Sequence, residues 1–355
     1  MIHLAAGSVK MAVLGGALLG GGGGGSMDLG LAFGNLAVAM DRVCLVQPDE
    51  LPGDAVIVTV GAVGAPAAQD RYVTPRHYVR AVDLLCRHEG IRVGGLITNE
   101  NGGFATVNGW LQAATLNVPV VDAPCNGRAH PTGLMGSMGL HRLEHFVSVQ
   151  CASGGDPKKG RYLETTVTGS LSQVAAVIRQ ISVQAGGIVA VARNPVSLEY
   201  VQENAAPGAI TQAMKVGKAL VENEGDPDRM AAKAMETLGG SVLATGIIED
   251  FSLMTEGGFD LGSVRLSTGH HLTFWNEYMT LDTENERVAT FPDLIMTLDA
   301  GSGLPLATAD LSLGRRVILV MSRRENLFLG GGMRDPGLFA MAEAAVGKPM
   351  VEYVF

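Results

Sequence analysis

The sequence contains few of the residues on which nucleic-acid-binding and disulfide-rich proteins depend. Of its 355 residues only two are Trp and six are Tyr, and 35 acidic side chains outnumber 26 basic ones, for a net charge of −9. No basic tract interleaved with aromatic residues is present, so nucleic acid is not an expected partner. Four cysteines lie far apart and lack the paired spacing of zinc-finger or redox motifs, so we expect reduced thiols.

Long apolar runs are also missing. No stretch reaches the roughly 18 apolar residues that a membrane-spanning helix requires. A secretory signal at the N-terminus is not expected either, because glycines at 15, 16 and 20–25 interrupt the apolar segment that follows Lys10. The sequence therefore predicts a soluble, cytoplasmic protein without a membrane partner. We further expect a homo-oligomer that acts on a small molecule.

Glycine is abundant, with 48 residues, which is well above the roughly 7% that average proteins contain. Hydrophobic residues make up 47% of the chain, enough for substantial cores. At 355 residues, the chain is long enough for two domains of about 150 residues each.

The first half of the chain alternates between helical and strand patterns. We expect helices at 8–19, 27–40, 75–88 and 106–116, and strands at 43–46, 55–60, 93–98 and 118–121. This alternation predicts an α/β domain, residues 1–165, with a largely parallel sheet covered on both faces. The glycine run and the Asp122–His130 loop belong to this domain.

The second half, residues 166–355, has a different pattern. Helices are expected at 170–184, 209–222 and 226–238, followed by short strands separated by turns at intervals of about ten residues. Such spacing is typical of an antiparallel barrel or sandwich. The sequence thus predicts an α/β fold followed by a β-rich domain.

The loop after the strand at 118–121 is the strongest candidate for an active site. An acid, a thiol, an amide, a guanidinium and an imidazole lie within nine residues: Asp122, Cys125, Asn126, Arg128 and His130. In open α/β sheets, ligands bind beyond the carboxyl ends of the strands. The alternative is that Asp122 caps a turn, Cys125 fills a gap, and the two basic residues face solvent.

A second polar group follows the strand at 93–98, where Asn99, Glu100 and Asn101 precede two glycines. Glu100 at this strand end can share a crevice with Asp122 and orient an attacking water or bind a ring N–H. The alternative is an exposed turn. His270 and His271 are adjacent on an expected strand, so they point to opposite faces and do not serve one metal together.

The glycine run at 20–25 precedes Ser26 and an expected helix. Successive glycine N–H groups can form a concave anion-binding nest, and the helix N-terminus adds partial positive charge. Nucleotide binding is disfavoured, because the run lacks a Gly-Lys-Ser/Thr ending and a preceding strand. The run is explained either by the binding of a small carboxylate or by the close packing of helices.

On these residues the sequence resembles the S-methyl thiohydantoin desulfurase family over nearly its whole length. The segments that carry the resemblance are Leu18–Gly23, Val60–Pro66, Asn99–Gly103, Val121–Asp122, Gly127–Arg128, Pro131, Pro207–Gly208, Asn276–Tyr278 and Phe291–Ile295. The resemblance implies a three-layer α/β N-terminal domain, a β-barrel-like C-terminal domain, and a site between them.

This chain departs from many relatives of the family at two positions. It carries His130 where an aromatic residue is common, and Cys125 where a thiol is uncommon. Together with Asp122, these side chains offer the nitrogen, sulfur and oxygen ligands suited to zinc. We therefore expect a divalent metal, zinc in the first place, held by Cys125, His130 and Asp122.

The resemblance implies water attack at C2 of an S-methyl thiohydantoin, which gives hydantoin and methanethiol. A metal would lower the pKa of the attacking water. The expected catalytic residues are Glu100, Asp122 and Arg128. The expected substrate-binding residues are Gly22, Gly23, Gly24, Ser26, Asn99, Asn101, Asn126, Asn276 and Glu277. The alternatives are a hydrolase that opens a hydantoin-like ring, and a non-catalytic small-molecule-binding subunit of a hydantoinase-type system.

Overall fold

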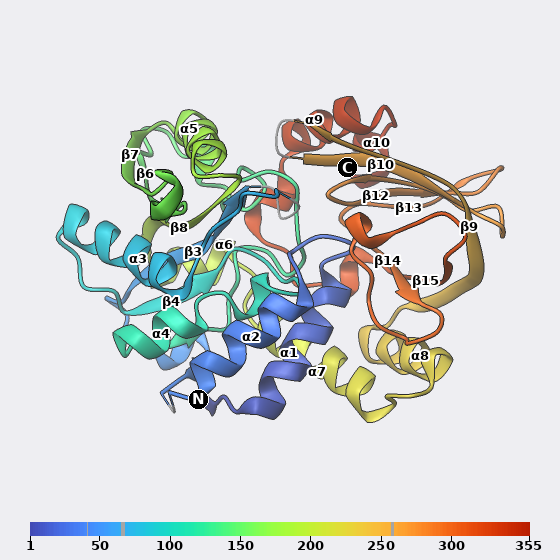
Figure 1. Ribbon diagram of the computed structural model, residues 1–355, viewed down its shortest axis with the longest axis horizontal. Coiled ribbons are helices and arrows are strands. Elements are labelled where there is room, and N and C mark those ends of the chain that lie inside the picture. The colour runs from blue at the N-terminus through green and yellow to red at the C-terminus, as the bar shows by residue number, and fades with distance from the viewer. Residues whose placement is uncertain (41, 65–67, 257–258) are drawn as a thin grey trace.

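The computed structural model describes residues 1–40, 42–64, 68–256 and 259–355, which form two lobes (Figure 1). The first lobe contains an eight-stranded mixed sheet with helices, and the second a seven-stranded antiparallel sheet that curls into a half-barrel. This arrangement confirms the predicted α/β plus β fold. Ala65 and Pro66, part of one family-like segment, lie outside the described residues.

The first sheet has four parallel strands flanked by antiparallel ones. Its order is β1 (Ile2–His3), β2 (Cys44–Val46), β5 (Val120–Val121), β4 (Gly95–Thr98), β3 (Val56–Gly64), β8 (Ile188–Ser197), β6 (Ser148–Gly154) and β7 (Leu163–Gly169). Strands β2, β5, β4 and β3 run parallel, whereas β8, β6 and β7 pair antiparallel. The sheet is therefore less parallel than the alternation of the first half predicts.

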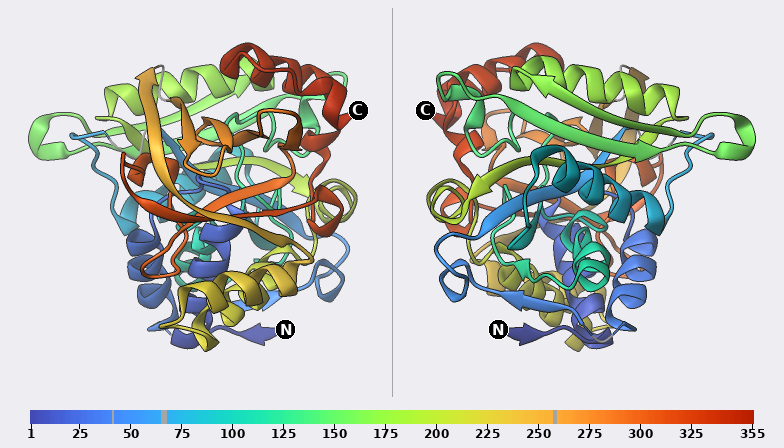
Figure 2. Two further views of the ribbon diagram at one scale, coloured as in Figure 1. Left: turned by 90° about the vertical axis from the view of Figure 1, so that its right-hand side faces the viewer. Right: turned by 90° about the vertical axis from the view of Figure 1, so that its left-hand side faces the viewer.

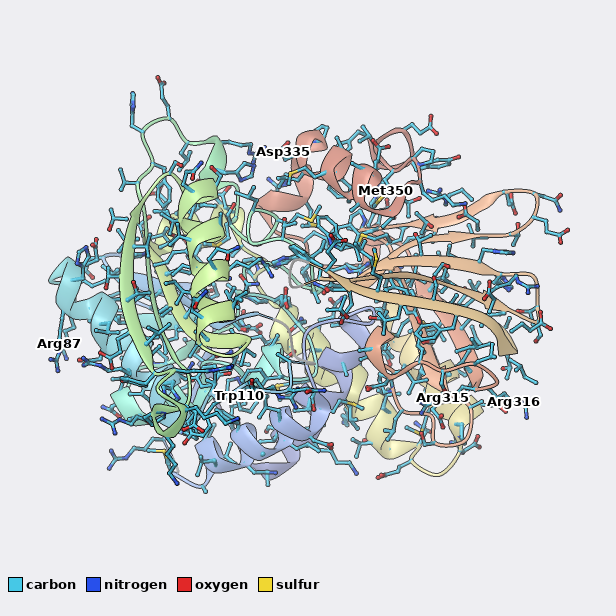
Figure 3. The ribbon with its side chains drawn as sticks, turned by 45° about the horizontal axis from the view of Figure 1, so that its top comes forward. Arg87, Trp110, Arg315, Arg316, Asp335 and Met350 are labelled. Atoms are coloured by element: carbon cyan, nitrogen blue, oxygen red, sulfur yellow. The ribbon has the colours of Figure 1, made fainter. Side chains whose placement is uncertain are left out.

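Helices cover both faces of this sheet. On one face, where Val58 and Val60 point, lie α1 (Ala6–Leu19), α2 (Met27–Val38), α3 (Pro75–Glu89) and α4 (Trp110–Leu116). On the other face, α5 (Leu171–Gln184) packs on Val189 and Val191, and α6 (Leu198–Asn204) on Ile57. The expected three layers are present, with Trp110 in the interior and Arg87 at the surface (Figure 3).

The expected domain boundary near residue 165 falls inside β7. Strand β8 pairs with both β3 and β6, so the first sheet continues to Ser197. After α6, the chain continues into α7 (Ala209–Glu222) and α8 (Pro227–Leu238). Helix α7 crosses α1 at backbone contact, because a Cβ atom on Gly15 or Gly217 would overlap the backbone of the other helix. This crossing fixes α1, and the glycine run that follows it, against α7.

The half-barrel has one continuous antiparallel order. It runs β13 (Arg287–Thr290), β12 (Glu277–Asp282), β11 (His271–Trp275), β10 (Phe259–Leu266), β9 (Ser241–Glu256), β15 (Arg316–Ser322) and β14 (Leu294–Asp299). Figure 2 shows the curl of this sheet in one view and the mixed sheet of the first lobe in the other. Among the described residues, no helix is both long and apolar enough to cross a membrane.

The C-terminal helices join the two lobes. Helices α9 (Pro336–Val346) and α10 (Val351–Val354) share a buried cluster with Met135 of the first lobe and Trp275 of the half-barrel. Asp335, labelled in Figure 3, caps α9 and lies 2.6 Å from Nε2 of His141. The loop that follows β5 is thereby attached to the second lobe.

Candidate functional site

The parallel strands bring two of the predicted polar loops together at one edge of the sheet. Nε2 of His130 lies 3.2 Å from Oε2 of Glu100, and the backbone N–H of His130 donates to the same oxygen at 3.2 Å. The His130 side chain is 2% exposed and that of Glu100 is 15% exposed. Glu100 is therefore a largely buried residue rather than part of an exposed turn.

The imidazole of His130 is held in one tautomer. Its Nδ1 lies 2.9 Å from the Thr132 carbonyl, which can only accept, so Nδ1 carries the ring proton and Nε2 is an acceptor. The amide of Asn99 donates to Nε2 at 3.1 Å, and Arg193 fixes that amide by donating to its Oδ1. Burial and the Arg193 cation lower the pKa of His130 to about 3, so the ring is neutral.

Glu100 is set to exchange a proton near neutral pH. Burial raises the pKa of Glu100 to about 7, although the His130 backbone N–H and the Arg193 cation act in the opposite direction. When protonated, Glu100 can donate to the acceptor Nε2 of His130. When ionised, it can accept a proton from a water molecule.

The loop at 131–139 lies directly on the imidazole. A Cβ atom on Gly136 would overlap the His130 ring and would lie 2.8 Å from Oδ1 of Asn99. The short helix that follows this loop, Leu140–Arg142, is attached to α9 through His141 and Asp335, and Ser137 of the loop contacts His141 at 2.9 Å. The His130–Glu100 pair is consequently covered by a segment that both lobes hold.

Arg128 is a fully buried cation that bridges the lobes. Its Nη1 donates to the carbonyls of Pro292, at 3.2 Å, and Asp293, and the guanidinium lies 4.5 Å from the Phe291 ring centre. Burial lowers the pKa of Arg128 to about 10, opposed first by Glu277, so it remains a cation at neutral pH. Its Nε and Nη2 have no hydrogen-bond partner among the described residues. Such unsatisfied buried donors are rare and indicate a missing polar partner.

Glu277 comes from the half-barrel and faces this cation. It is 2% exposed, and its Oε2 has no partner among the residues that the structure describes. Burial raises the pKa of Glu277 well above its ordinary value; the Glu100 charge raises it further, and Arg128 opposes the shift. Glu100, Arg128 and Glu277 thus form one electrostatically coupled group between the lobes.

The glycine run lies against both buried charges. A Cβ atom on Gly21 would overlap Nη2 of Arg128, and one on Gly23 would overlap the Glu277 carboxyl group. Gly22 and Gly24 have φ values of 99° and 80°, which favour glycine. The Tyr278 N–H donates to the Gly21 carbonyl at 2.8 Å. Close packing and backbone conformation therefore account for the run without a bound anion.

A cavity of about 110 Å³ lies beside the run. Gly22, Gly23 and Ser26 line it, together with the acidic residues Asp28 and Asp310. Ser26 caps α2 by accepting from the Leu29 N–H at 3.4 Å. Two acids in the wall make this cavity a poor fit for a carboxylate, so the nest interpretation gains no support from it.

The three expected zinc ligands do not converge. The Asp122 carboxylate caps α7, where it accepts from the N–H groups of Ile210 and Thr211 at 2.8 and 3.3 Å. The Cys125 thiol lies 3.3 Å from Thr59, and burial raises its pKa to about 11. Across residues 1–40, 42–64, 68–256 and 259–355, no group of three His, Cys, Asp or Glu side chains could hold a metal ion. Asp122, Cys125 and His130 therefore do not form the expected zinc site.

Three expected substrate-binding amides bind backbone instead. Asn101 donates to the carbonyls of Gly127 and Ala209, and Asn126 donates to the Arg128 carbonyl at 2.8 Å. Asn276 accepts from the Asp260 N–H at 2.9 Å. These side chains hold the loops that present Arg128 and Glu277. His270 and His271 lie at the opposite end of β11 from Asn276.

Arg193 is the site residue that the sequence analysis missed. It lies in β8, is 6% exposed, and orients Asn99. A sequence signal exists, because Arg193 and Asn194 interrupt the apolar run Ile188–Ala192 within a strand. A charged residue there either pairs or serves a site, since an unpaired buried charge is costly.

The comparisons with known proteins agree with this architecture. The N-terminal domain model of the S-Me-THD-like family matches residues 8–157, and the C-terminal domain model matches residues 170–329. The X-ray crystal structure of a protein from Chromobacterium violaceum matches with a TM-score of 0.74 and 22% identity, over 99% of each chain. That likeness shows a shared fold. None of the curated proteins compared matches this chain.

Proposed function

Because the chain belongs to the S-Me-THD-like (S-methyl thiohydantoin desulfurase) family, we propose that it hydrolyses an S-methyl thiohydantoin at C2, releasing hydantoin and methanethiol. The observation that carries this proposal is the Glu100–His130 pair at the strand ends, beside the unsatisfied donors of Arg128. A carboxyl group with a pKa of about 7 suits proton transfer at neutral pH.

Glu100 serves as the general base in this proposal. At 15% exposure its side chain is more accessible than the 2% exposed His130 ring, so a water molecule can reach it. The Asn99 amide and the backbone N–H of His130 donate to Oε2, at 3.3 and 3.2 Å, which orients the carboxylate. A base that takes a proton from the attacking water contributes about 10²–10⁴-fold to the rate.

Arg128 supplies donors to the substrate. Nε and Nη2 lack partners, so a ring carbonyl oxygen placed between them would satisfy both. The planar fork of an arginine provides this geometry, which the point charge of a lysine does not reproduce. Arg128 therefore positions the ring by its carbonyl while C2 faces the water held by Glu100.

The experiment is a product assay with the full chain and an S-methyl thiohydantoin. The proposal expects methanethiol and hydantoin in equal amounts, measured by gas chromatography and liquid chromatography. A new carboxylate without methanethiol would show ring opening instead. Saturable binding without turnover would show a binding subunit.

A further inference from the structure

We infer that Glu277 is a second catalytic residue, the general acid that protonates the ring nitrogen next to C2 while Glu100 activates the water. The inference rests on the proposed function and adds to it a proton donor from the opposite lobe. If Glu277 is the acid, the substrate must carry a C2=N nitrogen that can accept a proton.

Glu277 has a buried carboxyl oxygen without a hydrogen-bond partner among the described residues, as expected for a group that binds a ligand. The residue is 2% exposed, and its Oε2 lacks any partner within the described part of the chain. A structural carboxyl group at this depth would normally be satisfied, because leaving a buried polar group unpaired destabilises the fold. Gly23 closes over the other side of the carboxyl group, leaving Oε2 as the free atom.

The charges that face Glu277 determine its proton. Arg128 and Glu100 face it from the first lobe, and Asp293 lies with Arg128 in the same group. Burial and the Glu100 charge both favour the neutral, protonated form of Glu277, whereas Arg128 and a hydrogen bond from the backbone N–H of Glu277 itself oppose them. Two carboxyl groups whose environments separate their proton affinities can divide the acid and base roles between them.

The proton transfers balance over one turnover. Water oxygen forms a bond to C2, one water proton goes to Glu100, and the C2=N electron pair takes the Glu277 proton. As the tetrahedral intermediate collapses, its hydroxyl proton returns to Glu277 and C2=O forms. The C2–S bond breaks, and methanethiolate takes the proton from Glu100. Both carboxyl groups are restored.

Two substrates test this role with the full-length protein. One is the neutral S-methyl thiohydantoin, and the other is its analogue methylated at the acceptor nitrogen, a permanent cation that needs no proton. Glu277→Gln should lower kcat at least about a hundredfold for the neutral ring and less than about tenfold for the cation. Glu100→Gln should lower both. Glu284→Gln, an exposed acid on the β12–β13 turn, should match the wild type.

An equal loss for both substrates in Glu277→Gln would overturn the inference. If that variant does not fold, the wild type decides: kcat/KM should fall at alkaline pH for the neutral ring but not for the cation. The same alkaline fall for both would also overturn it. Wild-type protein that releases methanethiol from neither substrate would instead refute the proposed function.

Discussion

Replacing Asp122 with alanine should destabilise the fold rather than remove a catalytic group. The buried carboxylate accepts from Ile210 N–H at 2.8 Å, from Gln47 Nε2 at 2.9 Å, and from the N–H and hydroxyl of Thr211. Loss of a helix cap costs about 0.5–2 kcal/mol, and each buried donor left unpaired about 1–3 kcal/mol. We therefore expect the free energy of unfolding to fall by about 3–5 kcal/mol.

Urea unfolding followed by circular dichroism measures this loss. Asp226→Ala removes the cap of α8, where Oδ1 accepts from the Arg229 N–H at 3.1 Å, and should cost only about 1 kcal/mol. In the double variant Asp122→Ala, Thr211→Val, the loss of unfolding free energy should be smaller than the sum of the two single losses by about 1 kcal/mol or more, because the two side chains contact each other. Turnover per folded molecule should stay within about tenfold of wild type. Unchanged stability with a hundredfold or greater loss of kcat, roughly the effect of losing a base, would refute this reasoning.

Three further predictions concern the glycine run, the metal and the charge of Arg193. Gly23→Ala displaces the Glu277 carboxyl group, so kcat should fall for every S-methyl thiohydantoin; a loss confined to carboxylate-bearing substrates would indicate an anion nest. Cys125→Ser should leave the metal content, measured by mass spectrometry, unchanged, because the thiol contacts Thr59. If this variant lost a metal that the wild type binds stoichiometrically, Cys125 would be a metal ligand after all. Arg193→Met should move the acid limb of kcat/KM to higher pH, because the Arg193 cation lowers the pKa of Glu100, whereas Arg193→Lys should leave the limb in place.

Local patterns predicted the elements of the first lobe well. The helix expected at 75–88 is α3 at Pro75–Glu89, which begins at a proline and ends at Gly90 with a φ of 64°. The strand expected at 93–98 is β4 at Gly95–Thr98. These elements were predictable because their periodicity and their end signals are local.

Long-range contacts decided what the sequence did not predict. Strand β8 joins the first sheet by pairing with β3, which lies more than a hundred residues earlier, and no local pattern encodes that partner. The same limit applies to the site. The neighbouring strand ends predicted that Glu100 would share a crevice with Asp122. Glu100 instead contacts His130 of the same loop, because Asp122 caps α7 through residues far along the chain.

The pH dependence of methanethiol release tests the central claim, that Glu100 is the base, most directly. A base acts only when ionised, and burial raises the pKa of Glu100 to about 7. For wild type, kcat/KM should therefore rise through about pH 7 and fall again only at the more alkaline pH at which Glu277 loses its proton. In Glu100→Gln the rise should disappear and kcat should fall at least about a hundredfold. If Glu100→Gln kept the wild-type rate and the same rise, Glu100 would not be the base and the account would fail.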